Sequence, residues 1–258
     1  MKQSSIRFTR QLERLRNKIE RRGVKMAAAA LKNQYTSFLD KTKVTFPESW
    51  DKYADTLPEE PIRQFFLQYY KMAAPIALKV RKNMLGEKAA NDDEMLTVFE
   101  QYMLHLVNNE AGDMIKTITG TSRETILKMI RQTLSDGELN GWGVDKIRSE
   151  LFKTVGKNLR SNAFSRARAI AQTEIVKAAN QAQMKAANST NLEFRKYWLT
   201  SKLEGVRPTH QEAERYSIEK GGLRKDETFP NGLLHPGDPA GSAAEVINCR
   251  CQLVTEIV

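Results

Sequence analysis

The side chains best suited to chemistry lie in residues 207–258, which hold both cysteines and two of the three histidines of the chain. Cys249 and Cys251 are two positions apart, so their thiols would face the same side of an extended strand. With His210 and His235 they make a Cys₂His₂ donor set of the kind that Zn²⁺ accepts. The sequence therefore suggests one cofactor, a zinc ion held by these four residues.

The spacing of these residues favours a second interpretation, in which no metal is bound. Cys-x-Cys is shorter than the Cys-x₂₋₄-Cys pattern that is usual in zinc sites, and the two histidines are 25 positions apart. In the second interpretation the cysteines are reduced, buried and inert, and the histidine is bonded to loop backbone. A disulfide is not expected, because closing so small a ring would strain it.

An enzyme is a further alternative. The pair His210-x-Glu212 upstream of two cysteines is similar to the His-x-Glu and Pro-Cys-x-x-Cys motifs of zinc deaminases. The cysteine half, from Asn248 to Cys251, lacks the proline and is one residue short. The sequence also contains no Gly-x₄-Gly-Lys loop, no His-Glu-x-x-His and no Gly-x-Ser-x-Gly motif. We therefore expect no enzyme and assign no catalytic residue, and a zinc-dependent hydrolase or deaminase is kept as an alternative.

The element that must position these side chains is a small module at the end of the chain. Alternating aromatic and polar residues predict a strand over residues 192–200, and a second strand is predicted within 246–258. A short polar helix is predicted near 209–219. The pair Asn231-Gly232 is the strongest short hairpin signal in the chain and predicts a tight turn between two further strands. In the rigid turn that follows, we expect Asp238 to accept hydrogen bonds from nearby backbone amides.

Ahead of this module the chain is predicted to be helical. Thr121-Ser122-Arg123-Glu124 has the form of a capping box, which predicts that a helix begins there. A longer, alanine-rich helix is predicted to run from a cap at Ser161 or Asn162 to about Asn188. Glu174 and Asn180 are polar groups among its small residues, so we expect them to hold tertiary hydrogen bonds.

These patterns together predict an α+β fold, mainly α-helical with a small C-terminal antiparallel β-containing module. We divide the chain into a basic amphipathic helical arm, a second helical region, and a C-terminal domain made of helices followed by the module. The predicted boundaries are 1–45 for the arm, 46–119 for the helical region and 120–258 for the C-terminal domain, with helices over 120–188 and the module over 192–258.

The net charge of +10 is concentrated at the N-terminus. Residues 1–43 carry twelve basic and three acidic side chains, whereas the rest of the chain is almost balanced. A helix is predicted over about residues 4–40, with one narrow apolar stripe on an otherwise basic surface. Such a helix suits docking onto a partner or contact with phosphates. The residues expected to bind a partner are Arg7, Arg10, Leu12, Arg14, Leu15, Arg16, Lys18, Ile19, Arg21 and Arg22.

No segment of the sequence approaches the ~20 consecutive apolar residues that span a bilayer. The N-terminus has a positive charge but no apolar core of the secretory type. We expect the protein to be made in a cytoplasm and to contact no membrane during assembly.

The second half of the chain resembles a known family through motifs in a fixed order. They are Arg168-Ala-Ile-Ala-Gln-Thr-Glu174, Asn180, Trp198, Arg207-Pro-Thr-His210, Phe229, Gly232, Leu234, His235-Pro-Gly-Asp-Pro239, Glu245 and Asn248-Cys-Arg-Cys251. Over roughly residues 120–258 this order resembles the phage Mu F-type minor head (head morphogenesis) proteins. Gln172 is one departure, because the family often has arginine there.

The resemblance implies a bacteriophage minor capsid protein with several copies inside the virion head, near the portal vertex. It implies the portal protein and packaged double-stranded DNA as partners, and a role in DNA packaging or ejection. A nucleic-acid-binding protein outside any capsid is the alternative. The residues assigned to the structural motif of this region are Glu174, Asn180, Asp238 and Asn248.

Overall fold

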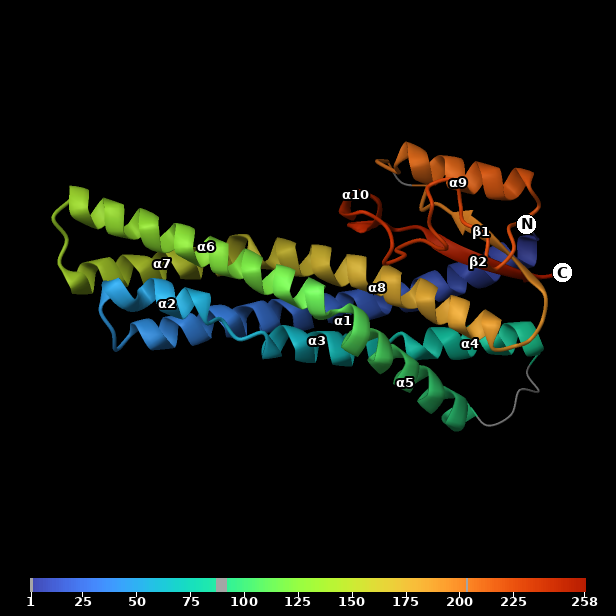
Figure 1. Cartoon of the computed structure of the whole chain (residues 1–258), viewed down its shortest axis with the longest axis horizontal. Helices are drawn as coiled ribbons and strands as arrows, with labels where there is room; N and C mark the ends of the chain where they lie inside the picture. The colour runs from blue at the N-terminus through green and yellow to red at the C-terminus, as the bar shows by residue number, and fades with distance from the viewer. Residues whose placement is uncertain (1, 87–91, 203) are drawn as a thin grey trace. The chain divides into compact units, whose positions relative to one another are not determined.

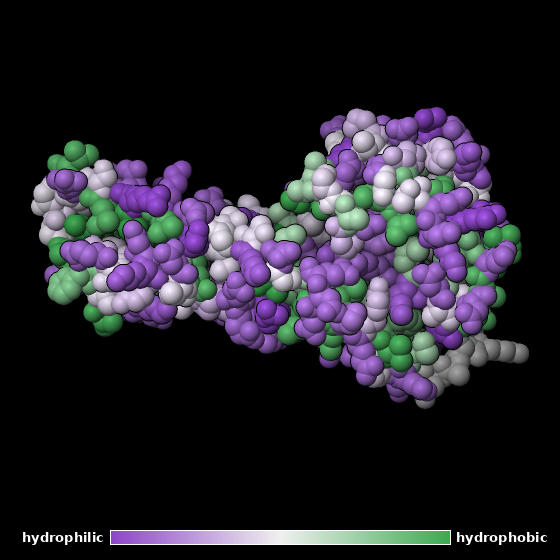
Figure 2. Space-filling model, viewed as in Figure 1, coloured by the Kyte–Doolittle hydropathy of each residue, from purple (hydrophilic) through white to green (hydrophobic). Residues whose placement is uncertain are grey.

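The computed structural model describes residues 2–86, 92–202 and 204–258 and consists mainly of helices, with one small sheet near the C-terminus (Figure 1). The predicted fold class, mainly α-helical with a small antiparallel β-containing module, is confirmed. The described residues contain no helix that is both long enough and apolar enough to cross a membrane. On the face shown in Figure 2, hydrophilic side chains predominate.

The helices of the first part of the chain follow the predicted pattern closely. Pro75 lies in the first turn of a helix and so separates it from the helix before it, because proline fits the start of a helix and not its interior. In chain order the elements are α1 (Gln3–Thr42), the 3-10 helix η1 (Pro47–Ser49), α2 (Trp50–Asp55), α3 (Glu60–Lys71), α4 (Ala74–Leu85) and α5 (Asp92–Glu110).

The remaining elements are α6 (Gly112–Leu139), α7 (Val144–Ser161), α8 (Ala163–Asn188), β1 (Phe194–Leu199), α9 (Pro208–Glu219), α10 (Ala243–Val246) and β2 (Gln252–Ile257). The helix predicted to begin at Thr121 is instead the middle of α6. Thr121 and Thr125 donate their hydroxyl hydrogens to carbonyls four residues earlier in α6, at 2.9 and 2.7 Å, so the hydroxyls cap no helix start.

The chain divides into two compact units that alternate along the sequence. Unit 1 comprises residues 1–23, 67–107 and 169–258. Unit 2 comprises residues 24–66 and 108–168. The sequence-based boundaries at residues 45 and 119 stay predictions.

Unit 2 has a core of large apolar side chains from α1, α2, α6 and α7. Tyr35, Phe38 and Trp50 pack there with Ile126, Ile130, Leu151 and Val155, all fully buried. Arg166 donates to the carbonyl oxygen of Ile118 at 3.2 Å, and the Gln34 amide donates to Thr119 Oγ1 at 2.9 Å. This unit therefore has the organisation expected of an ordinary helical bundle.

Unit 1 contains the module predicted at the end of the chain. β1 pairs with β2 antiparallel, with Phe194 opposite Ile257 and Leu199 opposite Gln252. Helix α9 packs against β1, as Figure 1 shows. Trp198 lies at the centre of the module, 5.1 Å from the Phe229 ring and 5.0 Å from the His210 ring, measured between ring centroids. A two-stranded sheet is marginal alone, so packing on helices is what stabilises it.

The hairpin predicted at Asn231-Gly232 is not formed. Gly232 has the positive φ of a tight turn, 78°, and its amide donates to the carbonyl of Phe229 at 2.8 Å. The residues on either side are loop and not strand. The turn signal was correct, and the amide of Phe229 donates to the carbonyl of Leu233 across the turn at 2.9 Å, but the pairing goes no further and no second strand pair forms.

Gly23 is the point where α1 comes closest to α3. A Cβ atom at this position would lie 2.2 Å from Cε2 of Tyr69. That ring has no room to move, because Tyr69 is fully buried and its hydroxyl donates to the carbonyl of Ala171 in α8 at 2.8 Å. The missing side chain of Gly23 therefore allows α1, α3 and α8 to meet.

We predict that Gly23→Ala lowers the free energy of unfolding by about 1–3 kcal/mol, the usual cost of overpacking. Gly120→Ala is the matched control, because Gly120 is also helical and nothing lies within 4 Å of its added Cβ. In an open helical position alanine stabilises by about 0.5–1 kcal/mol relative to glycine. Chemical denaturation measures the free energy of unfolding of both variants. Equal changes in the two would show that the contact at Gly23 is not tight.

Candidate functional site

Three of the four predicted metal donors come together in unit 1. Nδ1 of His210 lies 3.8 Å from Sγ of Cys249 and 3.4 Å from Sγ of Cys251. The donor atoms of these residues all lie within 4.8 Å of one another, and all three residues are buried. We refer to His210, Cys249 and Cys251 as the Cys/His cluster.

His235 does not belong to this cluster, so the predicted four-residue donor set is corrected to three. His235 is buried, and its Nδ1 lies 3.2 Å from the carbonyl oxygen of Pro236. Within the described residues, the group of donors close enough to share an ion contains His210 and the cysteines only. The physical reason is the turn at Pro236–Asp238, which fixes the histidine close to its own backbone.

The two cysteines converge through a bend of the chain and not through a strand. β2 begins at Gln252, after both cysteines. Asn248 has a positive φ of 56°, and the amide of Cys251 donates to Sγ of Cys249 at 3.4 Å. The expectation that both thiols face one side is met, but the predicted reason, an extended strand, was wrong.

Glu245 of α10 fixes the orientation of the His210 ring. Its Oε2 lies 2.9 Å from Nε2 of His210, and its Oε1 accepts from the Thr209 hydroxyl at 3.1 Å. A carboxylate at Nε2 favours the tautomer with the proton on that nitrogen, in which the lone pair of Nδ1 faces the two sulfurs. Sequence reasoning missed this contact, although Glu245 was among the residues that carry the family resemblance.

The two thiols have unequal acidity. A hydrogen bond from Cys251 and the neighbouring His210 lower the pKa of the Cys249 thiol to about 5. The same contact with Cys249, together with burial, raises the pKa of the Cys251 thiol. Of the two thiols, that of Cys249 is therefore the one that loses its proton more readily.

A cavity of about 190 Å³ adjoins the cluster and opens toward the loop before α9. Ser201, Glu204 and Arg207 line it from that loop, and Asn248 lines it from the side of the cysteines. Both cysteines and His210 also line the cavity. The cluster is thus accessible to a small ligand from one side.

Helix α8 holds the chain segment that carries the cysteines. The Gln172 amide donates to the carbonyl of Asn248 at 2.9 Å, and the Asn248 amide donates to Thr173 Oγ1 at 3.0 Å. Oδ1 of Asn180 accepts from the Leu253 amide at 2.9 Å, and its Nδ2 donates to the carbonyl of Pro236 at 2.9 Å. The tertiary hydrogen bonds predicted for Asn180 are confirmed.

Arg16 of α1 holds the same segment from another side. Its guanidinium donates from Nη1 to the carbonyl of Cys251 and from Nη2 to the carbonyl of Arg250, both at 3.2 Å. Arg16 is buried, and burial lowers the pKa of its guanidinium. The prediction that Arg16 binds an external partner was therefore wrong, because its charge is used to satisfy backbone carbonyls.

Two apolar residues predicted to bind a partner are also buried inside the protein. Leu12 and Ile19 each expose only 4% of their surface, whereas Leu15 is half-buried. The narrow apolar stripe of the helix is thus used for packing within unit 1. The six remaining predicted contact residues, Arg7, Arg10, Arg14, Lys18, Arg21 and Arg22, are all exposed.

The motif residues Glu174 and Asp238 also have tertiary or turn partners. The Tyr70 hydroxyl donates to Oε2 of Glu174 at 2.6 Å, and burial raises the pKa of this carboxyl. Asp238 accepts from the amides of Leu234 at 2.8 Å and Ala240 at 3.0 Å, as predicted. These residues stabilise the fold around the cluster and lie outside it.

Lys196 is a buried charge that sequence reasoning missed. Its Nζ donates to the carbonyls of Lys225 and Leu234, both at 3.0 Å. Burial lowers the pKa of this lysine to about 8. The signal was present, because position 196 falls between Phe194 and Trp198 on the inward side of the alternating strand pattern.

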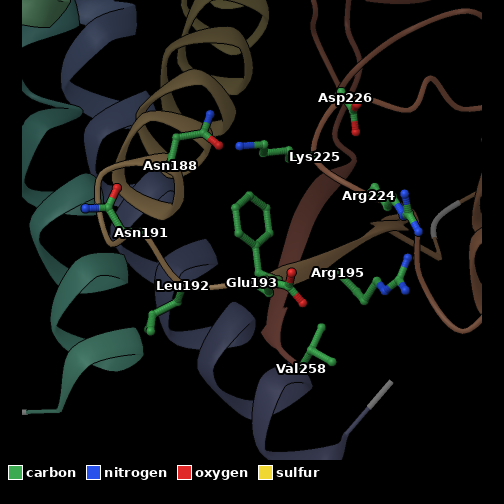
Figure 3. Close-up of a pocket in the computed structure, with 10 residues that line it drawn as sticks. Asn188, Asn191, Leu192, Glu193, Arg195, Arg224, Lys225, Asp226 and Val258 are labelled. Carbon is green, nitrogen blue, oxygen red and sulfur yellow. The ribbon is translucent and has the colours of Figure 1, made fainter.

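A second hollow, of about 540 Å³, lies at the end of α8 and along β1 (Figure 3). Arg195, Arg224 and Lys225 line it together with Glu193 and Asp226. Because cations and carboxylates alternate around it, the hollow has no single charge preference. We assign no ligand to it.

We predict that Asn180→Ala lowers the free energy of unfolding by about 2–3 kcal/mol, because it leaves the buried Leu253 amide without its partner and removes the Asn180 donor from the Pro236 carbonyl. Asn188→Ala on the same helix is the control, since Asn188 is exposed and such a substitution changes stability by about 0.5 kcal/mol or less. Urea denaturation monitored by tryptophan fluorescence measures both. Equal losses would show that the Asn180 bonds contribute little.

The raised pKa of Glu174 predicts how stability depends on pH. A carboxyl whose folded pKa lies above its unfolded value stabilises below the unfolded pKa and loses this contribution as pH rises. From pH 4.5 to pH 7, the wild type should therefore lose stability relative to Glu174→Gln, which is neutral throughout and keeps an acceptor for Tyr70. Parallel curves of unfolding free energy against pH for the two proteins would contradict the prediction.

Comparison with known proteins bears on the half of the chain that contains the cluster. The family described as "Phage Mu protein F like protein" matches residues 118–254, a range that runs from α6 into β2 and includes α8, His210 and both cysteines. Comparisons with curated proteins and with solved structures find no match. The match covers more than half of the 258 residues, so the chain belongs to the phage Mu F-like family of head morphogenesis proteins.

Proposed function

We propose that this protein is a minor capsid protein that lies inside the phage head at the portal vertex, beside the packaged DNA, in several copies. The family is one of phage head morphogenesis and is not a known class of enzymes. The observation that carries the finer proposal is a single cationic face on the first half of α1. We define the cationic face as Arg7, Arg10, Arg14, Lys18, Arg21 and Arg22.

The cationic face is produced by the helical period. From Arg7 to Arg21 its members follow one another in steps of three and four residues, so they lie on one side of α1. The opposite side of the helix carries buried Leu12, Arg16 and Ile19. From position 7 to position 22, at ~1.5 Å per residue, the face extends over about 22 Å.

The acidic residues of this segment do not neutralise the cationic face. Oε1 of Glu20 lies 3.4 Å from Nη2 of Arg250, and Oε1 of Glu13 lies 3.9 Å from Nη2 of Arg16. Among the residues that the structure describes, no carboxylate lies within 4.0 Å of a charged nitrogen of the cationic face. Six uncompensated cations on one exposed helix are suited to an acidic partner surface or to phosphates.

The burial of the apolar stripe changes the kind of contact that we propose. A helix docking through Leu12 and Ile19 would bind by apolar contact and tolerate salt. With those residues buried, the contact is electrostatic and weakens as salt rises. We infer that acidic groups of the portal form the main contact and that DNA phosphates lie close by.

The glutamates that sequence and contacts bring to the cluster do not have the role that a zinc deaminase requires. In such enzymes a glutamate faces the metal-bound water as general acid and base. Glu212, which would supply it here by spacing, is exposed on α9. Glu245, the carboxylate that does reach the cluster, is bonded to the histidine ring itself.

Co-expression with the portal protein of the same phage tests the proposal. We expect the wild type to co-purify with the portal at low salt and Arg7→Glu/Arg10→Glu/Arg14→Glu to lose this association. The control is Lys116→Glu/Lys128→Glu/Arg131→Glu, which reverses three exposed cations of α6 and changes net charge equally. Equal loss of portal association in both variants would show that the effect depends on net charge and not on the cationic face.

The same experiment distinguishes the alternative of a nucleic-acid-binding protein outside a capsid. Wild type that never co-purifies with the portal, yet binds double-stranded DNA with a steep salt dependence, would favour that alternative. Each phosphate neutralised contributes a slope of about −0.9 in log K against log salt concentration.

A further inference from the structure

We propose that His210, Cys249 and Cys251 bind one zinc ion, with a water molecule from the adjoining cavity as the fourth ligand. This inference is independent of the portal contact, because it concerns buried residues at a distance in sequence from the cationic face. It replaces the four-residue donor set that the sequence suggested.

The distances within the cluster are those of a tetrahedral zinc site. With Zn–S of about 2.3 Å and Zn–N of about 2.0–2.1 Å, a sulfur and a nitrogen bound to the same tetrahedral ion lie about 3.6 Å apart. The observed distances from Nδ1 of His210 to the two sulfurs, 3.8 and 3.4 Å, lie on either side of this value. Small adjustments of the side chains would place all three donors around one ion.

Two sulfurs share one imidazole nitrogen in this arrangement. Nδ1 of a neutral imidazole has one lone pair and accepts one hydrogen bond. Both sulfurs nevertheless approach that single nitrogen, and the carboxylate of Glu245 lies at the other ring nitrogen, where it favours the proton. A cation between the three donors satisfies the lone pair and both sulfurs together.

The surroundings of the cluster are those of a metal-bound thiolate pair. Glu245 at Nε2 of His210 makes the carboxylate–histidine arrangement that orients and strengthens a metal-ligating imidazole. The Cys251 amide donates to Sγ of Cys249. The buried indole N–H of Trp198 has no oxygen or nitrogen acceptor among the described residues.

The fourth position is open to the cavity. Because His235 is held by its own turn, the protein offers three donors, as in zinc sites that keep one position for water. Glu204 and Arg207 line the cavity and could hydrogen-bond that water. The ion would join α9 to the segment before β2, which are far apart in sequence, so it would stabilise the module.

Metal analysis of the full-length protein, purified under reducing conditions without added metal, tests the proposal directly. We expect about one zinc per chain in the wild type, loss of that zinc in Cys251→Ser, and its retention in His235→Gln. Wild type without zinc would overturn the proposal. Loss of zinc in a folded His235→Gln protein would overturn the three-donor set.

A second measurement does not depend on variants that could fail to fold. The metal-free wild type is titrated with Co²⁺, which replaces zinc and reports its ligands by absorption. We expect thiolate-to-cobalt charge-transfer bands and the visible bands of a tetrahedral ion, both removed by one equivalent of zinc. Absence of these bands in folded protein would contradict the site.

The role of Glu245 is tested by affinity. As a positioning residue, Glu245→Gln should weaken zinc binding about 10–100-fold, the usual effect of removing such a partner. Glu212→Gln is the matched control, because Glu212 is exposed on the same helix as His210. Equal affinities of the two variants in a chelator competition would show that Glu245 does not act through the histidine.

Discussion

Buried backbone groups need hydrogen-bond partners, and in unit 1 this constraint determines how the module is built. Residues 249–251 are buried or half-buried, but they precede β2 and so have no strand to pair with. Side chains supply the partners instead, from α8 on one side and from Arg16 on the other. The position of the cysteines therefore depends on polar residues that are distant in sequence.

This constraint also explains why the first half of α1 is divided into two faces. A buried guanidinium is costly unless its donors find acceptors, and two carbonyls of the cysteine segment accept from Nη1 and Nη2 of Arg16, whereas its Nε has no partner among the described residues. Once Arg16, Leu12 and Ile19 face inward, the helical period turns the other cations outward. The internal packing of α1 and its exposed cationic face thus arise from the same rotation of the helix.

Local sequence patterns predicted the elements that depend on residues close to one another in the sequence. The alanine-rich helix α8, the division of the chain at Pro75 and the strand around Trp198 all follow from periodicity, proline geometry and β propensity. The helix start expected at Thr121 failed because a capping box is a local preference that a longer helix overrides. The hairpin at Asn231 failed because pairing needs two neighbouring strands, and a turn alone does not create them.

The sequence predicted which types of residue form the candidate site but not which individual residues belong to it. His210 and the cysteines were identified from residue type, yet the exclusion of His235 and the inclusion of Glu245 depend on how distant segments meet. Arg16 shows a further limit. The helical period places it on the same side as Leu12 and Ile19 and places Arg14 on the other side, but the carbonyls of residues 250 and 251 that accept from Arg16 are distant in sequence.

Gln172 shows how this network constrains the residue at its own position. Its amide both donates to the carbonyl of Asn248, at 2.9 Å, and accepts from Nη2 of Arg250, at 2.5 Å. An arginine at this position, which the resemblance leads one to expect, could donate to the carbonyl but could not accept from Arg250. The two cations would repel each other in a partly buried space, so an arginine at 172 requires a different partner at 250 or a different path for its side chain. The residue at 172 and the residue between the two cysteines are therefore coupled, and the departure from arginine is accommodated by the contact that holds the cluster in place.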